Sequence, residues 1–239
     1  PQLSDVSTTL RLLMDMGSSF VLEEDSSISI DSSSLTKLTA EYELVKTMRA
    51  SILTLGPMLA KYKKAKISLP GGCAIGTRPV NLHLSALEQM GAKIEVKNGY
   101  IYASTNELVG AQINFDMISV TATENIIMAA TLAKGTTTIN NAAQEPEVTD
   151  LVKCLNKMGA KITGENTSTI VIQGVDHLSG IDYSICPDRI EAGTYLVAAA
   201  ITGGKIVVNN IEPDSMRSVI GKLIETGADI QTNQNSIKL

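Results

Sequence analysis

The chain has 239 residues, enough for one large or two modest domains. Its net charge is -5, lysine and arginine are dispersed, and only 3% of its residues are aromatic, with no tryptophan, which argues against nucleic acid as a partner. No apolar run approaches membrane-spanning length and no N-terminal signal is visible, so we expect a cytoplasmic protein without a membrane partner.

The cysteines and histidines do not form a recognisable metal or disulfide pattern. Three cysteines, Cys73, Cys154 and Cys186, are widely spaced, and their odd number excludes a disulfide framework. The same spacing excludes a Cys-x-x-Cys metal site, and two histidines are too few for a histidine-rich centre. We therefore expect no metal.

An internal repeat organises the chain. Four segments that end in a glycine, most of them close to Leu-x-x-Met-Gly-Ala, have the pattern of the last turn of an amphipathic helix. Glycine readily adopts the left-handed conformation just past a helix, which makes these glycines predicted helix ends. They are Gly17, Gly91, Gly159 and Gly227, spaced 74, 68 and 68 residues apart. A fixed period of this length indicates a supersecondary repeat.

The predicted unit runs strand, helix, strand, helix, strand, strand. A trailing half unit occupies residues 1–31, a polar bridge 32–40, and three units about 40–104, 110–173 and 181–239. Helices are predicted at 45–59, 124–132 and 190–200, and strands at 65–69, 93–96, 100–103, 136–139, 161–163, 169–172, 205–208, 229–231 and 236–239. Because one unit cannot bury its apolar faces alone, we predict an α/β fold in which several units share a core of helices.

A local basic run, Lys61, Lys63, Lys64 and Lys66, allows two interpretations. We favour a solvated turn, with a phosphate site as the alternative.

The most informative segment is residues 70–80, which read Pro-Gly-Gly-Cys-Ala-Ile-Gly-Thr-Arg-Pro-Val. Its glycines let the backbone approach a ligand and expose N–H groups, and Arg78 offers a planar fork for phosphate or carboxylate. Pro79 is predicted as the first helical residue, which would place free helix N–H groups beside the thiol of Cys73. The positive charge of Arg78 and the free helix N–H groups both favour the thiolate form of Cys73, so we expect Cys73 to be more reactive than Cys154 or Cys186. The alternative is a turn with a buried cysteine.

Other strings join this loop in pointing to one family. They are Lys-Thr-Met-Arg-Ala-Ser at 46–51, Ser-Val-Thr-Ala-Thr-Glu-Asn at 119–125, Gln-Glu-Pro-Glu at 144–147 and Pro-Asp-Arg-Ile-Glu-Ala-Gly-Thr at 187–194. Together they resemble the bacterial UDP-N-acetylglucosamine 1-carboxyvinyltransferase family over essentially the whole chain. The resemblance implies an inside-out α/β barrel of two domains with three repeats each. It assigns residues 1–187 to most of the cysteine-loop domain and 188–239 to the first part of the second domain.

The resemblance also implies a reaction. The family transfers the enolpyruvyl group of phosphoenolpyruvate to the 3-hydroxyl of UDP-N-acetylglucosamine, releases phosphate, needs no metal or organic cofactor, and commits the sugar nucleotide to peptidoglycan synthesis. Cys73 matches the catalytic cysteine, which serves as proton donor and is alkylated by fosfomycin. The residues that match substrate contacts are Arg49, Arg78, Pro79, Val80, Asn81, Leu82, Met117, Ser119 and Val120.

The chain departs from the family at several positions. Asn81 stands where some relatives have aspartate, Met117 where some have lysine, and Thr121 where glycine is frequent. A family Lys-Asn pair and the aspartate that takes the acceptor's proton have no match within the 239 residues. We therefore expect a fragment that folds but does not turn over, and that self-associates through an apolar helix face left open at the half unit.

Four further residues are secondary candidates. For His83 we favour a structural or substrate-lining role over acid-base work. Glu145, Asp188 and Arg189 lie at predicted strand-to-helix turns, where a site role and a favourable charge at a helix N-terminus are equally supported. Two rival functions remain open: the shikimate-using enolpyruvyl transferase, which the Gly-Gly-Cys loop disfavours, and a non-catalytic fragment that only binds sugar nucleotide or another subunit.

Overall fold

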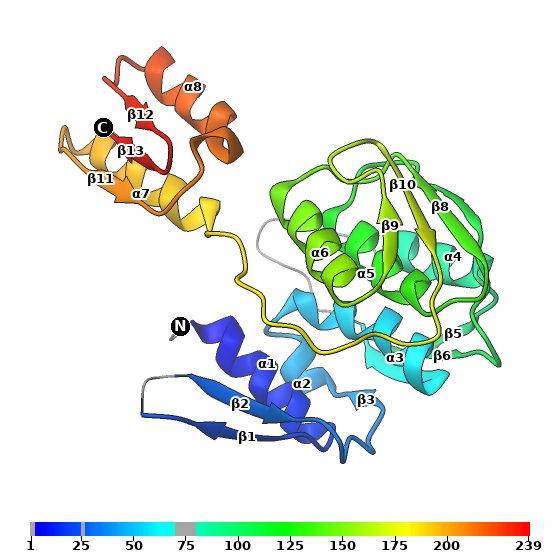
Figure 1. Cartoon of the computed structure of the whole chain (residues 1–239). Coiled ribbons are helices and arrows are strands. Elements are labelled where there is room, and N and C mark those ends of the chain that lie inside the picture. The colour runs from blue at the N-terminus through cyan, green and yellow to red at the C-terminus, as the bar shows by residue number, and fades with distance from the viewer. Residues whose placement is uncertain (1–2, 25–26, 70–79) are drawn as a thin grey trace. The chain divides into compact units, whose positions relative to one another are not determined.

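The computed structural model describes residues 3–24, 27–69 and 80–239 (Figure 1). It divides into two compact units, Pro1–Ile181 and Asp182–Leu239, which are described separately below. No helix in the described ranges is both long and apolar enough to cross a membrane.

The first unit begins with the predicted half unit. Helix α1, Ser4–Asp15, precedes a hairpin of β1, Ser19–Leu22, and β2, Ile28–Asp31. Leu12 of α1 and Met16, which follows the helix, are buried. The order helix, strand, strand is the second half of the predicted repeat, so this prediction is confirmed.

Two complete repeats follow in the first unit. The first contains β3 (Thr39–Ala40), α2 (Tyr42–Val45), η1 (Arg49–Thr54), α3 (Leu55–Tyr62), β4 (Lys64–Ser68), α4 (Asn81–Gln89), β5 (Lys93–Lys97) and β6 (Tyr100–Ser104). The second contains β7 (Gln112–Asn114), α5 (Val120–Thr131), β8 (Thr136–Asn140), α6 (Pro146–Lys157), β9 (Lys161–Thr163) and β10 (Thr169–Gln173). Their sheets have equivalent strand orders, β3-β4-β6-β5 and β7-β8-β10-β9, which confirms the predicted repeat.

The second unit is a less complete copy. It contains α7 (Arg189–Ile201), β11 (Val207–Asn209), η2 (Pro213–Met216), α8 (Arg217–Glu225), β12 (Gln231–Asn233) and β13 (Ser236–Lys238). Residues 182–188 form no strand, so the predicted first strand of this unit is wrong. Strands β11 and β12 also begin two residues later than predicted.

The predicted helix at 45–59 is wrong, because the segment is divided among α2, η1 and α3. Pro57 gives the physical reason for the boundary between η1 and α3. Proline lacks a backbone N–H and its ring clashes with the carbonyl four residues earlier, so an α-helix cannot pass smoothly through it. In the structure Pro57 lies in the first turn of α3, where that N–H would have no intrahelical partner. Helix η1 (Arg49–Thr54) therefore ends just before the turn that contains Pro57.

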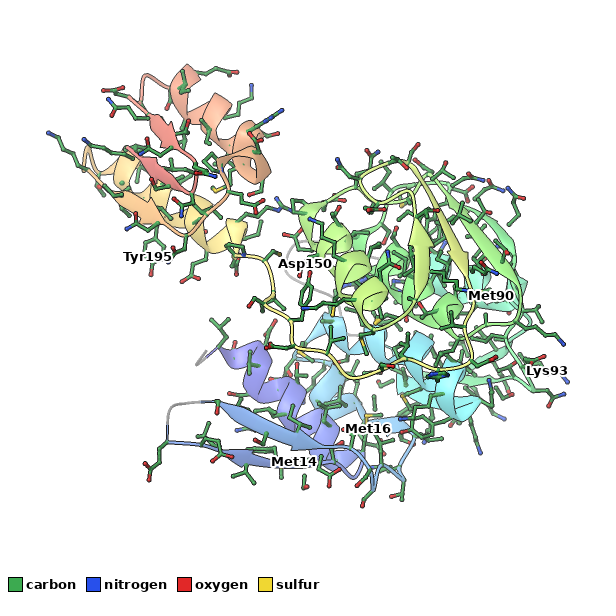
Figure 2. The ribbon with its side chains drawn as sticks, in the orientation of Figure 1. Met14, Met16, Met90, Lys93, Asp150 and Tyr195 are labelled. Carbon is green, nitrogen blue, oxygen red and sulfur yellow. The ribbon has the colours of Figure 1, made fainter. Side chains whose placement is uncertain are left out.

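The four predicted helix ends are confirmed. Gly91, with φ of 92°, donates its N–H to the Glu88 carbonyl at 2.9 Å, and the next N–H, of Ala92, bonds to the Leu87 carbonyl at 3.0 Å. Gly17, Gly159 and Gly227 end their helices in the same way. These are the two bonds of a Schellman cap. Met16 and Met90, labelled in Figure 2, occupy equivalent positions before these glycines, and both are buried.

Helix α5 is the centre of packing in the first unit. It contacts η1, α3, α4 and α6, and most of its residues are buried. Strands β8 and β10 alternate buried and more exposed residues, as expected when one face of a sheet packs on helices and the other faces water. The basic run lies at the end of α3 and on β4, where Lys66 Nζ is 4.4 Å from the Tyr100 ring centroid.

Candidate active site

Three of the predicted substrate-binding residues lie at the start of α5. Ser119 is its N-cap, and its Oγ accepts a hydrogen bond from the Ala122 N–H at 3.3 Å. Met117 is exposed, whereas Ser119 and Val120 are half-buried. The first N–H groups of a helix have no intrahelical partner and favour anions, so this segment can contact a negatively charged ligand.

Three more predicted residues lie at the start of α4. Val80 is the N-cap, Asn81 is exposed, and Leu82 packs partly buried against the core. The helix therefore begins two residues later than predicted, at Asn81. Cys73, Arg78 and Pro79 lie outside the described residues.

His83, in the first turn of α4, is buried and hydrogen-bonded. Its Nδ1 lies 2.9 Å from Nδ2 of Asn125, and its Nε2 lies 3.4 Å from Oγ1 of Thr121. Burial, together with the positive charge of Arg49, lowers the pKa of His83 to about 4. The imidazole is therefore neutral at physiological pH, which disfavours the acid-base role and favours the structural or lining one.

Arg49, a predicted anion-binding residue, is the first residue of η1 and is half-buried. Asn125 of α5 holds the end of this turn. Its Nδ2 donates to the Ile52 carbonyl at 3.1 Å, and its Oδ1 accepts from the Gly56 N–H at 2.8 Å. Asn125 was not among the predicted site residues, although a polar residue inside an otherwise apolar helix is a usable signal.

Carboxylates gather where α5 meets the start of α6. Burial, together with the negative charges of Glu147 and Glu145, raises the pKa of Glu124 to about 7. Glu145 is the residue before α6 but makes no side-chain cap, and its Oε2 is buried without a hydrogen-bond partner among the described residues. A carboxyl group with this pKa is partly protonated at neutral pH, so Glu124 can give or take a proton. Glu124 was not among the predicted site residues.

The remaining candidates lie in the second unit. Asp188 caps α7, because its Oδ1 accepts from the N–H groups of Ile190 at 2.8 Å and Glu191 at 3.0 Å. This is the helix-terminus role that the sequence allowed. Arg189 is the first residue of α7 and lines a cavity of about 330 Å³ between α7 and α8.

Among the described residues, the candidate site coincides with neither a metal cluster nor the cavity beside β4. Within 3–24, 27–69 and 80–239, no three His, Cys, Asp or Glu side chains are placed to hold a metal ion. A cavity of about 550 Å³ is lined by Lys64 and Lys66 of β4 and Lys93 of β5, among others, and none of its lining residues is a predicted site residue. The candidate site is instead built from the first turns of α4, α5 and α6, together with η1.

The fold is that of the enolpyruvyl transferases. The enolpyruvyl transferase NikO from Streptomyces tendae matches the whole chain with a TM-score of 0.82 at 17% sequence identity, and the chain covers 57% of it. EPSP synthase from Acinetobacter baumannii matches 98% of the chain with a TM-score of 0.69 at 22% identity, and 56% of that protein is covered. At these identities the likeness concerns the fold alone.

The chain belongs to the EPSP synthase (3-phosphoshikimate 1-carboxyvinyltransferase) family, whose model matches residues 1–239. Among its relatives, the UDP-N-acetylglucosamine 1-carboxyvinyltransferase of Vesicomyosocius okutanii is 73% identical over all 239 residues, and that of Ruthia magnifica is 72% identical. The corresponding protein of Hydrogenovibrio crunogenus is 54% identical. The chain spans 57% of the length of each of these relatives.

Proposed function

We propose that this chain belongs to an enzyme that transfers the enolpyruvyl group of phosphoenolpyruvate to the 3-hydroxyl of UDP-N-acetylglucosamine and releases phosphate. The product would enter peptidoglycan synthesis. One observation carries the proposal: the chain is 73% identical, along its whole length, to a protein named for this activity. The architecture proposed for the whole enzyme is the inside-out α/β barrel, with the domain boundary at residues 187 and 188, close to the division between the two compact units at 181 and 182.

The proposed residue roles follow the chemistry. Addition of the sugar 3-hydroxyl to phosphoenolpyruvate, an enol phosphate, requires a proton delivered to the methylene carbon and stabilisation of the positive charge that develops on the carbon bearing the oxygen; loss of phosphate and of a proton from the resulting methyl group then restores the double bond. Cys73 would deliver the proton, and as a nucleophilic thiolate it would also be the group that fosfomycin alkylates. Arg78 and Arg49 would hold anionic groups, and an arginine can do so through two parallel hydrogen bonds.

The sugar nucleotide would lie along the starts of α4 and α5. Val80, Asn81 and Leu82 would contact it from α4, together with Pro79, and Ser119 and Val120 would contact it from α5. Asn81 is exposed and retains an oxygen acceptor in place of a charge. Met117, 58% exposed, offers no positive charge to a diphosphate.

The test is phosphate release by the full-length protein with each of two acceptors. With phosphoenolpyruvate present, we expect release with UDP-N-acetylglucosamine and none with 3-phosphoshikimate. The reverse result would assign the protein to the shikimate-using branch. Arg78→Ala should lower turnover severely with little change in melting temperature, while the exposed Arg11→Ala serves as the matched control.

For the 239-residue chain by itself, we expect a cooperative thermal transition without turnover. It spans 57% of the relatives' length, and positioning of both reactants by a complete site contributes roughly 7–11 kcal/mol of barrier reduction. Steady phosphate release by the isolated chain would contradict this expectation. Calorimetric titration with UDP-N-acetylglucosamine would show whether the chain retains binding without catalysis, the alternative function.

Self-association of the isolated chain is also part of the proposal. Val21 and Leu22 of β1 and Ile30 of β2 are exposed by 57%, 65% and 49%. Exposed apolar side chains gathered on one hairpin favour association with a second copy. Sedimentation at rising concentration should show dimers, and Leu22→Lys should reduce them.

A further inference from the structure

Asn125 is a fully buried polar side chain inside the apolar helix α5, and it joins three other elements. Its hydrogen-bond partners determine which way the amide group points. Gly56 offers an N–H, which only the amide oxygen can accept, at 2.8 Å. Ile52 offers a carbonyl oxygen, which only the amide NH₂ can approach as a donor, at 3.1 Å. Both contacts agree on one orientation.

This orientation determines the protonation of His83. The second N–H of the Asn125 amide points to Nδ1 of His83, 2.9 Å away. An NH₂ group donates and cannot accept, so Nδ1 must be the unprotonated nitrogen of the ring. A neutral imidazole carries one proton, which is then on Nε2. Nε2 lies 3.4 Å from Oγ1 of Thr121 in the first turn of α5, beside the segment that the sequence assigns to ligand binding.

We propose that Asn125 is a positioning residue for the active site: it holds the turn that carries Arg49 and fixes His83 as the neutral tautomer with its proton on Nε2. In this arrangement His83 presents a hydrogen-bond donor toward the start of α5 and takes no part as an acid or a base. Only the catalytic consequence rests on the proposed function. The tautomer itself does not.

Nitrogen NMR of histidine side chains tests the tautomer directly. The 239-residue chain has two histidines, His83 and His177. Labelled with ¹⁵N-histidine, this chain gives two imidazole patterns, and His177→Gln shows which pattern belongs to His83. We expect His83 to show a protonated Nε2 and an unprotonated Nδ1 near neutral pH. A protonated Nδ1 in the wild-type protein would overturn the proposal, whether or not any variant folds.

Two variants test whether Asn125 or Thr121 determines the tautomer of His83. Asn125→Asp keeps an acceptor for Gly56 but presents a carboxylate oxygen to Nδ1, so His83 should gain a proton on Nδ1. Thr121→Val removes the partner of Nε2 and should leave the tautomer unchanged. An unchanged His83 pattern in folded Asn125→Asp, or a changed one in Thr121→Val, would contradict the proposed control by Asn125. The exposed Asn114→Asp is the matched control.

The catalytic consequence is tested in the full-length protein. Asn125→Asp should lower kcat by at least about tenfold, because residues that contact the transition state would no longer be held in position. Asn114→Asp should leave kcat unchanged. Unchanged turnover in Asn125→Asp would overturn the positioning role. If the full-length wild-type protein does not transfer enolpyruvate, the proposed function fails, and the NMR result still decides the tautomer.

Discussion

A Cβ atom on Gly56 would lie 2.4 Å from the main-chain oxygen of Asn125 and 2.5 Å from its Oδ1. Helices α3 and α5 can therefore approach each other at this point only because residue 56 has no side chain. The same approach allows the Gly56 N–H to bond to Asn125. One glycine thus supports both helix packing and the candidate site.

We expect Gly56→Ala to lower the free energy of unfolding by about 2–3 kcal/mol, the cost of forcing a methyl group into a packed core. Chemical denaturation measures this loss. Gly221→Ala is the matched control, because Gly221 is also helical but has open space around its Cβ position. That change should be neutral or stabilising by up to about 1 kcal/mol. Equal effects in the two variants would contradict the close approach.

The lowered pKa of His83 predicts a pH dependence of stability. The unfolded chain binds a proton to this histidine near its ordinary value of 6.5, whereas the folded protein binds it only at about 4. Between these values the unfolded state holds more protons, so His83 lowers stability as the pH falls from 6.5 to 4. Relative to His83→Gln, the wild-type protein should lose up to about 3 kcal/mol over this range.

Denaturant titrations of both proteins at several pH values measure this difference. His177→Gln, which changes an exposed histidine, should follow the wild-type curve. Parallel curves for wild type and His83→Gln would show that His83 titrates normally.

Glu124 should change the stability of the protein with pH in the direction opposite to His83. Its pKa is raised from 4.5 to about 7, so the folded state holds the proton where the unfolded state has released it. Its contribution to stability is therefore present at low pH and declines as the pH rises from 4.5 to 7. Glu124→Gln should be more stable than wild type by about 1–3 kcal/mol at about pH 8, with the gain disappearing near pH 4.

Thermal or denaturant unfolding across this pH range provides the measurement. Glu88→Gln, on an exposed position of α4, is the control and should show no such gain. A constant gain for Glu124→Gln at all pH values would mean that the carboxyl group is not titrating in this range.

Cys73 should react with iodoacetamide before the other two cysteines. The reason is its glycine-rich loop and the neighbouring Arg78, which favour thiolate. Cys154 and Cys186 are both partly buried, which limits their access to reagent. Peptide mapping after brief alkylation measures the order. Earlier labelling of Cys154 would contradict the prediction.

Local signals in the sequence determined the repeat and most of its elements. The glycines that end α1, α4, α6 and α8 are predictable because residues just past a helix adopt a conformation that glycine accepts at little cost. The strands that pair within one unit are predictable because alternating apolar residues mark a face that must be buried. The break at Pro57 was equally local, since proline affects the residues immediately around it, and it was missed.

The contacts that build the candidate site were decided by tertiary structure. Asn125 is separated by 69 residues from Gly56 and by 42 from His83, and nothing in the sequence around either residue specifies their partner. The pKa values of His83 and Glu124 likewise depend on burial and on charges brought close by other elements. The sequence by itself therefore determined the repeating units and the residues matching a family site. Only the packing of η1, α3 and α4 around α5 decided which polar groups meet, because desolvation and hydrogen-bond geometry depend on distances that exist only in the folded chain.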